Sequence, residues 1–242
     1  MSRLLACLCA AFASLASAGD FGVSPIRVDL DRGTKSALVT VTNDDHKPLA
    51  FQVRVMEWTQ DIAGADQYAD STDLVYFPRQ LRIPPKESRV VRLGYKAPAS
   101  HVEKAYRLFI EELADPERDP ARTSVAITLR FGVPVFVRPA SMHLAGELNL
   151  TAAGGAPVAL VRNTGTVHFR IAAVRYAGIG HNGETLFEQS IDGWYVLAGS
   201  QRSYSLAPPP GMCAKAALLR AEAVAEKLVL RAERPFVPQD CP

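Results

Sequence analysis

The stretch TSVAITLRFGVPVFVRPA (residues 123–140) decides the fold class, because its apolar side chains fall on alternate positions over most of its length. The members of this apolar row are Val125, Ile127, Leu129, Phe131, Val133, Val135 and Val137. A period of two is typical of a β-strand with one apolar face. Since strands usually have about 5–6 residues, the sequence predicts an unusually long strand with an unbroken apolar row.

Shorter runs with the same alternation lie on both sides of this stretch. They cover residues 36–43, 50–58, 81–95 and 106–113, and several further segments between residues 146 and 206. The runs are rich in β-branched and aromatic residues, and clusters of Gly, Pro, Asn and Asp separate them. Many short strands without a convincing long helix indicate β-sandwiches. The chain length suits two domains, with a hinge at Pro139.

Residues 1–18 have the features of a secretory signal peptide. Arg3 gives a positive start, a short apolar run follows, and Ala16-Ser17-Ala18 is a small-x-small cleavage site. The run is too short for a membrane span, which needs about 20 apolar residues. We therefore expect a soluble, exported protein that is not embedded in a membrane, with one domain at residues 19–140 and a second at residues 141–242.

Export leaves Cys213 and Cys241 as the cysteines of the mature chain. In an oxidising compartment such a pair most simply forms a disulfide, whereas a metal site needs more ligands than two distant cysteines. The segment 214–232 between them has two interpretations. Its Ala, Leu, Glu and Lys content favours a helix, but a hairpin would bring both cysteines together. We favour the hairpin.

The sequence carries no catalytic or nucleic-acid-binding signature. Its formal net charge of +2 gives no strong field for an anionic partner such as nucleic acid. The five histidines have no metal-site spacing, and no GxSxG motif or free mature cysteine supplies a nucleophile. We expect a binding protein that is not an enzyme and uses no metal or cofactor, and a periplasmic hydrolase on a β scaffold is the least favoured alternative because no triad or metal set is visible. An exported two-domain adhesin or carbohydrate-binding module of immunoglobulin-like fold is the alternative.

Several segments resemble the periplasmic pilus-assembly chaperones of the chaperone–usher pathway, the PapD-like family, in its archaic or alternative branch. They are FGVSPIRVDLDRGTKSALVTVTN (21–43), IPPKESRVVRLGY (83–95), YRLFIEEL (106–113), VAITLRFGVPVFVRPA (125–140), VRNTGTVHFRI (161–171) and GWYVLAGSQRSYSL (193–206). The resemblance implies an all-β boomerang of two immunoglobulin-like sandwiches in the periplasm. Its implied partners are pilus or fimbrial subunits and an outer-membrane usher.

The resemblance also implies how the apolar row is used. In that family the chaperone's long strand completes a subunit that lacks its own last strand, which is a form of donor-strand complementation. The matching positions are Val125, Ile127 and Leu129. An apolar edge strand is an association hazard when bare, so the free protein is also a candidate for self-association.

A second implied site binds the subunit's terminal carboxylate through two basic residues. The first matches Arg27, but the second falls on Pro134, which carries no charge. Either Arg89 or Arg130 is the expected substitute, with Arg89 ranked first, unless Arg27 acts alone.

Two further pairs of residues match family positions. Arg92 and Glu103 match charges that lock the two domains together. Pro48 and Leu113 match a pair at the tip of the first domain that influences docking to the usher.

Overall fold

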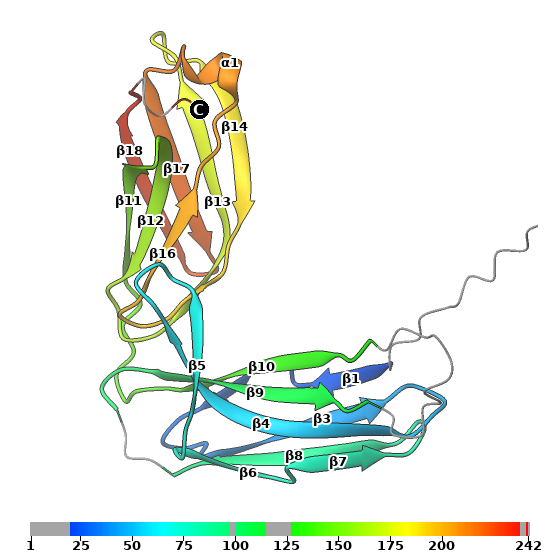
Figure 1. Cartoon of the computed structure of the whole chain (residues 1–242). Coiled ribbons are helices and arrows are strands. Elements are labelled where there is room, and N and C mark those ends of the chain that lie inside the picture. Colours follow the sequence, from blue (N-terminus) through cyan, green and yellow to red (C-terminus); the bar gives the residue numbers. More distant parts are fainter. Residues whose placement is uncertain (1–19, 97–99, 115–126, 238–240, 242) are drawn as a thin grey trace, which may run out of the picture.

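The computed structural model describes residues 20–96, 100–114, 127–237 and 241. Figure 1 shows two elongated bodies set at an angle about a hinge, and strands make up most of each body. The all-β class and the boomerang of two sandwiches are therefore confirmed. The expected signal peptide at residues 1–18 lies outside the described residues. The boundary expected at residue 140 falls in a connection between strands, and it stays a prediction.

The first sandwich contains the strands from Phe21 to Val137. One sheet has the order β1 (Phe21–Ser24), β3 (Ser36–Asn43), β8 (Ser88–Tyr95), β6 (Leu74–Phe77). The facing sheet has the order β2 (Val28–Leu30), β10 (Arg130–Val137), β9 (Lys104–Glu112), β4 (Leu49–Gln60), β5 (Asp66–Asp70), and β7 (Gln80–Ile83) also pairs with β4.

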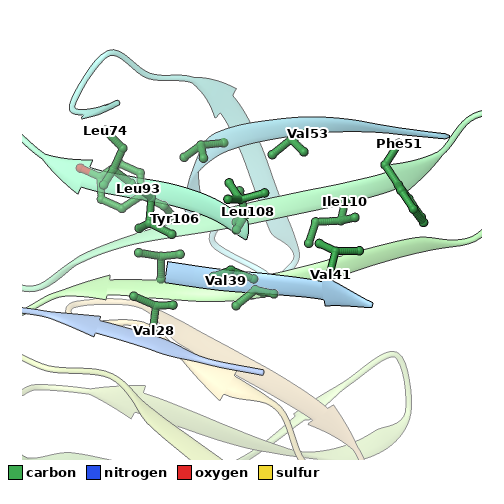
Figure 2. Packing of buried hydrophobic residues seen from close by; sticks show 14 of the residues in the cluster. Val28, Val39, Val41, Phe51, Val53, Leu74, Leu93, Tyr106, Leu108 and Ile110 are labelled. Atoms are coloured by element: carbon green, nitrogen blue, oxygen red, sulfur yellow. The ribbon is translucent and has the colours of Figure 1, made fainter. Parts of the chain in front are cut away.

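Alternate residues of these strands meet in one apolar core. Val39, Phe51 and Leu108 are fully buried there, and Figure 2 shows these side chains pointing toward one another between the two sheets. Full burial of such a side chain stabilises the fold by about 1.5–3 kcal/mol. The period-two pattern of the sequence therefore corresponds to the face of each strand that points into this core, while Ala105 of β9 and Phe136 of β10 are buried on the opposite face.

The second sandwich contains the strands from Gly146 to Pro235. One sheet has the order β11 (Gly146–Ala153), β12 (Ala156–Asn163), β16 (Gln201–Ser205). The other has the order β14 (Thr185–Asp192), β13 (Phe169–Ile179), β17 (Leu218–Ala225), β18 (Leu228–Pro235), with β15 (Tyr195–Val196) also paired to β13. Its core is built around fully buried residues that include Ile171, Leu206 and Leu219.

The segment after Cys213 is a hairpin, not a helix. Strands β17 and β18 pair in register from Leu218 opposite Pro235 to Ala225 opposite Leu228. Ala221 and Ala223 are buried on the inward face of β17, so packing in the sheet overrides their preference for a helix. Cys213 forms the expected disulfide with Cys241, at a Cα–Cα distance of 5.7 Å. A short helix, α1 (Pro210–Cys213), precedes the hairpin.

The unbroken strand expected over residues 123–140 is shorter in the structure. Strand β10 begins at Arg130 and ends at Val137, so the described residues 127–129 and 138–140 lie outside it. Val133 and Val135 are fully buried under the facing sheet. Residues 127–131 are exposed at the other end of the same row. The apolar row therefore continues beyond the part of the strand that the first domain buries.

Candidate functional site

One edge of β10 is open along part of its length. The strand pairs antiparallel with β9 from Arg130 to Val137, but it pairs with β2 only from Val135 to Val137. Among the described strands, residues 130–134 therefore have a neighbour on one side only. The Glu112 N–H donates to the Leu129 carbonyl at 2.9 Å. By antiparallel alternation, odd-numbered residues point their N–H and C=O groups toward β9, and even-numbered residues point theirs toward the open edge.

The apolar row is exposed beside this open edge. Ile127, Leu129 and Phe131 are 44%, 40% and 37% exposed. Two of the three residues expected to enter a subunit are thus accessible, and the third, Val125, lies outside the described residues. An exposed apolar row on an unpaired edge is the arrangement that natural sheet proteins avoid unless it binds a partner.

The hydrogen-bonding groups of the open edge are partly missing or occupied at Gly132 and Pro134. Pro134 has no N–H, so an edge donor is missing at that even-numbered position. Arg107 stands opposite Pro134 on β9, and its Nη1 donates to the Gly132 carbonyl at 3.1 Å. Sequence reasoning did not identify Arg107, because only the strand register shows that it is the neighbour of Pro134.

A cleft of about 270 Å³ lies between the two sandwiches, and Arg27 lines it. The Arg27 Nη2 donates to Asp29 Oδ1 at 2.9 Å, and Arg138 Nη2 binds the same oxygen at 3.0 Å. Other charged residues of the lining are Glu103, Arg170, Glu226 and Lys227. The cations in this lining outnumber the carboxylates, so the cleft suits an anionic group.

Neither expected substitute for the second base lines this cleft with Arg27. Arg89 forms an ion pair with Glu87 at 2.8 Å. Arg130 forms one with Glu111 at 2.7 Å, and four strand residues, about 13 Å, separate it from Pro134. The arginine that shares Asp29 with Arg27 is Arg138, which directly precedes the hinge proline and which sequence reasoning passed over.

The charge contact between the domains differs from the expected pair. Glu103 and His168 form a buried contact, with side chains 2% and 6% exposed, through the His168 N–H at 2.9 Å and the His168 Nδ1. The Glu103 N–H donates to the Thr166 carbonyl at 2.9 Å. Arg92 is exposed on β8, and within the described chain no ion pair joins it to Glu103. Glu103 does face the second domain, but its partner there is His168.

An apolar cluster seals the same interface. Trp58, Phe136 and Leu197 are buried in it, with Ala105 and Tyr195 packed against them. The His168 ring stacks on Phe136 at a centroid distance of 3.5 Å. The outward face of β10 is thus covered by the second domain at Phe136.

The hairpin formed by β4 and β5 reaches across to the second domain. Gln60 Nε2 donates to the Tyr195 carbonyl at 2.9 Å, and Gln60 Oε1 accepts from the Leu197 N–H at 3.0 Å. At the tip of the loop a Cβ on Gly64 would lie 2.7 Å from Arg202 Cα. No local pattern predicts this contact, since neither segment has a distinctive sequence.

A polar group ties the hinge end of β9 to the loop before β6. Lys104 Nζ and the Tyr106 hydroxyl both donate to Asp73 Oδ2 at 2.7 Å. These hydrogen bonds hold the pKa of Asp73 below its usual value, and the bond from Lys104 has the larger effect. The same contact raises the pKa of Lys104.

The two candidate usher contacts lie at one end of the first sandwich. Pro48 is exposed in the connection between β3 and β4. Leu113 follows β9, is 42% exposed, and its N–H donates to the Ala50 carbonyl at 2.8 Å. The structure therefore brings the neighbourhoods of Pro48 and Leu113 together, and their role stays a prediction.

No cluster of three or more His, Cys, Asp or Glu side chains in the described part of the chain has an arrangement that could hold a metal ion. None of the described helices has the length and apolar character needed to cross a membrane.

Comparison with known families decides the identity of the fold. Residues 20–143 match the model for the pili and flagellar-assembly chaperone, PapD N-terminal domain. This chain belongs to the PapD chaperone family. As a PapD-family protein it is a chaperone of pilus assembly.

Curated relatives of this PapD-family chaperone have the same character. The probable fimbrial chaperone EcpB of Escherichia coli O139:H28 is 26% identical over 196 residues, which cover 79% of this chain and 83% of the relative. EcpB of Escherichia coli O1:K1 is 25% identical over 211 residues, which cover 85% of this chain and 90% of the relative.

Solved structures share the fold of this PapD-family chaperone. One is a chain of the CsuC–CsuE chaperone–tip adhesion subunit pre-assembly complex, from archaic chaperone–usher Csu pili of Acinetobacter baumannii. It aligns with a TM-score of 0.65 at 18% identity and covers 87% of this chain and 98% of that chain. The Escherichia coli chaperone DraB aligns with a TM-score of 0.56 at 14% identity and covers 92% and 98%.

Proposed function

We propose that this chaperone acts in the periplasm, where it binds pilus subunits by donor-strand complementation, prevents their aggregation and delivers them to an outer-membrane usher. The exposed row of Ile127, Leu129 and Phe131 beside the open edge of β10 carries this proposal. Main-chain bonds along the edge would give affinity, and alternate side chains would fill pockets of the subunit.

The interdomain cleft supports a place for the subunit's terminal carboxylate. Arg27 and Arg138 both bind a single Asp29 oxygen, so one carboxylate faces two guanidinium groups. A second carboxylate would complete the charge balance, and bonds between guanidinium and carboxylate are among the strong hydrogen bonds of proteins. Arg27 is the proposed anchor, and Arg138 is its neighbour in this role.

Solved relatives offer a precedent for complexes of this kind. One similar structure is described as a complex of chaperone and tip adhesion subunit, and another as the Salmonella enterica SafA pilin in complex with the SafB chaperone. For this chain we infer a partner of the same class, a pilus subunit that lacks one strand. Pro48 and Leu113 are the proposed contacts to the usher.

The test is co-purification from the periplasm with a matched pair of variants. The full chain is expressed with candidate pilus subunits from the same genome, and recovery of each subunit on the tagged chaperone is measured. Leu129→Glu places a charge on the proposed donor row. Val229→Glu places the same charge on β18 at a residue of similar exposure, 41% against 40% for Leu129.

We expect the wild type and Val229→Glu to recover a subunit in a one-to-one complex and Leu129→Glu to recover at least tenfold less. Circular dichroism and thermal unfolding of each free variant confirm that the fold is retained. Equal recovery by Leu129→Glu and the wild type would show that the row does not enter the subunit. No recovery of any subunit by the wild type would contradict the proposed function itself.

A further inference from the structure

We propose that the outer face of the sheet β1-β3-β8-β6 binds an anionic membrane surface, where exposed apolar side chains enter the headgroup region and cations bind lipid phosphates. This inference goes beyond the proposed function and does not rest on it. The face points away from the second domain, because the facing sheet carries the residues that the second domain covers, Trp58, Ala105 and Phe136. Figure 1 shows β6 and β8 on the side of the first domain that is turned away from the second domain.

Alternation along two strands defines which side chains lie on this outer face. Val39 of β3 and Leu93 of β8 are fully buried in the core. Since successive side chains of a strand point to opposite faces, their neighbours Leu38 and Arg92 point outward. The register pairs Arg92 with Leu38 on one side and with Phe77 of β6 on the other. One row across the face therefore has an arginine between two apolar residues.

The first observation that points to a partner is the exposure of the apolar side chains on this face. Phe77 is 76% exposed, and Val75 on the same strand is 53% exposed. Leu38 of β3 and Val90 of β8 are 52% and 45% exposed. Such a group on three neighbouring strands is more than a scattered apolar residue, and an exposed apolar group with polar residues at its border marks an interaction site.

The second observation is the charge on this side of the first domain. Residues 74–96, which contain β6, β7 and β8, have six basic residues and one acidic residue, whereas the whole chain has a formal net charge of only +2. The four strands of the sheet contain no acidic residue. The weak charge of the whole chain therefore conceals a local positive field, which suits an anionic surface.

The cations of the face are available to a partner. Within the described part of the chain, no carboxylate forms an ion pair with Arg92 or Lys96. Two carboxylates at the border of the face are held by other cations, Glu87 at 2.8 Å and Asp73 at 2.7 Å. A third, Asp44, lies beside the edge strand β1. The centre of the face thus has positive charge without a carboxylate to balance it.

The arrangement favours a lipid surface over an acidic protein. The apolar side chains protrude from the exposed face of a sheet, whereas an aromatic anchor at a protein interface fills a pocket. Phenylalanine and aliphatic residues accompanied by Lys and Arg are typical of segments that lie in the interfacial region of a membrane. The long stems of Arg and Lys can lie along apolar groups while their charged ends reach the phosphates.

A membrane contact at this face is compatible with the binding of a subunit. The contact uses neither the open edge of β10, which belongs to the facing sheet, nor the cleft between the two sandwiches. A chaperone that lies on a membrane through Phe77 and Arg92 therefore keeps its row at Ile127 and Leu129 free.

The experiment measures co-sedimentation of the mature chain with lipid vesicles at low ionic strength. One set of vesicles contains phosphatidylglycerol and phosphatidylethanolamine, and the other contains phosphatidylcholine alone. Retention on immobilised polyglutamate measures binding to an acidic polypeptide. For the wild type we expect at least about fivefold more bound protein on the anionic vesicles than on the zwitterionic ones. This difference should shrink as salt is added, because salt screens the attraction.

Two variants of the face have matched controls in the second domain. Phe77→Ser and Arg92→Glu should each reduce binding to the anionic vesicles at least about threefold. Val229→Ser removes an apolar residue that is 41% exposed on β18, and Arg175→Glu reverses an exposed arginine on β13. Both controls should bind like the wild type. Arg92→Glu and Arg175→Glu change the net charge equally, so only the position of the charge differs between them. Thermal unfolding of each variant checks that the fold is retained.

Equal losses in Arg92→Glu and Arg175→Glu would overturn the proposal, because the net charge alone would then explain the binding. Equal binding of the wild type to both kinds of vesicle, or to neither, would overturn it as well. Retention on polyglutamate without binding to vesicles would assign the face to an acidic protein instead. Leu129→Glu should bind vesicles like the wild type, and a loss in this variant alone would place the lipid contact on the donor row. None of these outcomes affects subunit recovery, which tests the proposed function separately.

Discussion

The two ends of β10 carry the same apolar pattern in opposite surroundings. Val133 and Val135 are fully buried by the facing sheet, and Phe136 is fully buried against the second domain. Phe131 and Leu129 continue the row only a few residues away and are exposed. The difference lies in what covers the strand, not in the strand's own residues, so one continuous pattern serves a core at one end and an interaction surface at the other.

Two phenylalanines, one at each end of β10, allow the same substitution to test this difference in burial. Phe136→Ala should destabilise the protein by about 3–5 kcal/mol, since it opens a cavity beside Trp58 and His168. Phe131→Ala should change stability by less than about 0.5 kcal/mol, as is usual for exposed sites. Urea unfolding of both variants checks this, and equal losses at the two positions would refute the division of the strand.

Two carboxylates, Asp73 near the hinge end and Glu111 at the outer end, allow a second comparison with smaller expected losses of stability. Asp73→Asn should cost about 1–2 kcal/mol, because it weakens two hydrogen bonds from Lys104 and Tyr106. The matched change at the outer end is Glu111→Gln, which breaks the more exposed contact with Arg130 and should cost about 0–1 kcal/mol. A larger loss from Glu111→Gln than from Asp73→Asn would reverse this order.

The contribution of Asp73 to stability should depend on pH. The pKa of Asp73 is lower in the folded protein than in the unfolded chain, so its contribution to stability is present above the unfolded value of about 3.9. It is lost as the pH falls through the lower folded pKa. Between pH 7 and pH 3 the stability difference between the wild type and Asp73→Asn should therefore shrink in urea titrations, and a difference that grows toward acid would contradict the sign.

The smallest expected change in stability is at the exposed end. Ile127→Lys should alter the unfolding free energy by less than about 0.5 kcal/mol, while it should reduce any self-association of the free protein through the bare row. Sedimentation velocity over a range of concentrations measures this. A tendency to associate that is identical in the wild type and the variant would place the contact on another surface.

The sequence was sufficient for the architecture because period-two burial is a local property. Alternation identified the longer strands but not β5 and β6, and the two mature cysteines distinguished the terminal hairpin from a helix of favourable composition. The row at Ile127 and Leu129 followed from the same alternation together with the family resemblance. The strands and the hairpin needed only neighbouring residues or one covalent constraint, whereas the boomerang of two domains and the use of the row came from the family resemblance.

The rest of the site depends on contacts between distant segments, which no local pattern encodes. Arg107 reaches Gly132 only because the register of β9 and β10 places it opposite Pro134. Glu103 meets His168, not Arg92, because the second domain closes over the start of β9. Arg138 is an ordinary arginine before a proline until the fold sets it beside Asp29.

The close approach at Gly64 has a consequence for the molecule as a whole. The loop tip rests directly on the main chain of Gln201 and Arg202, at a backbone conformation with φ of 86° that side chains disfavour. The contact between the main chain at Gly64 and the main chain of Gln201 and Arg202 limits how closely the two domains approach each other at this loop. Even the single methyl of an alanine at this point would lie 2.7 Å from the Arg202 Cα, so the loop and the second domain would have to move apart.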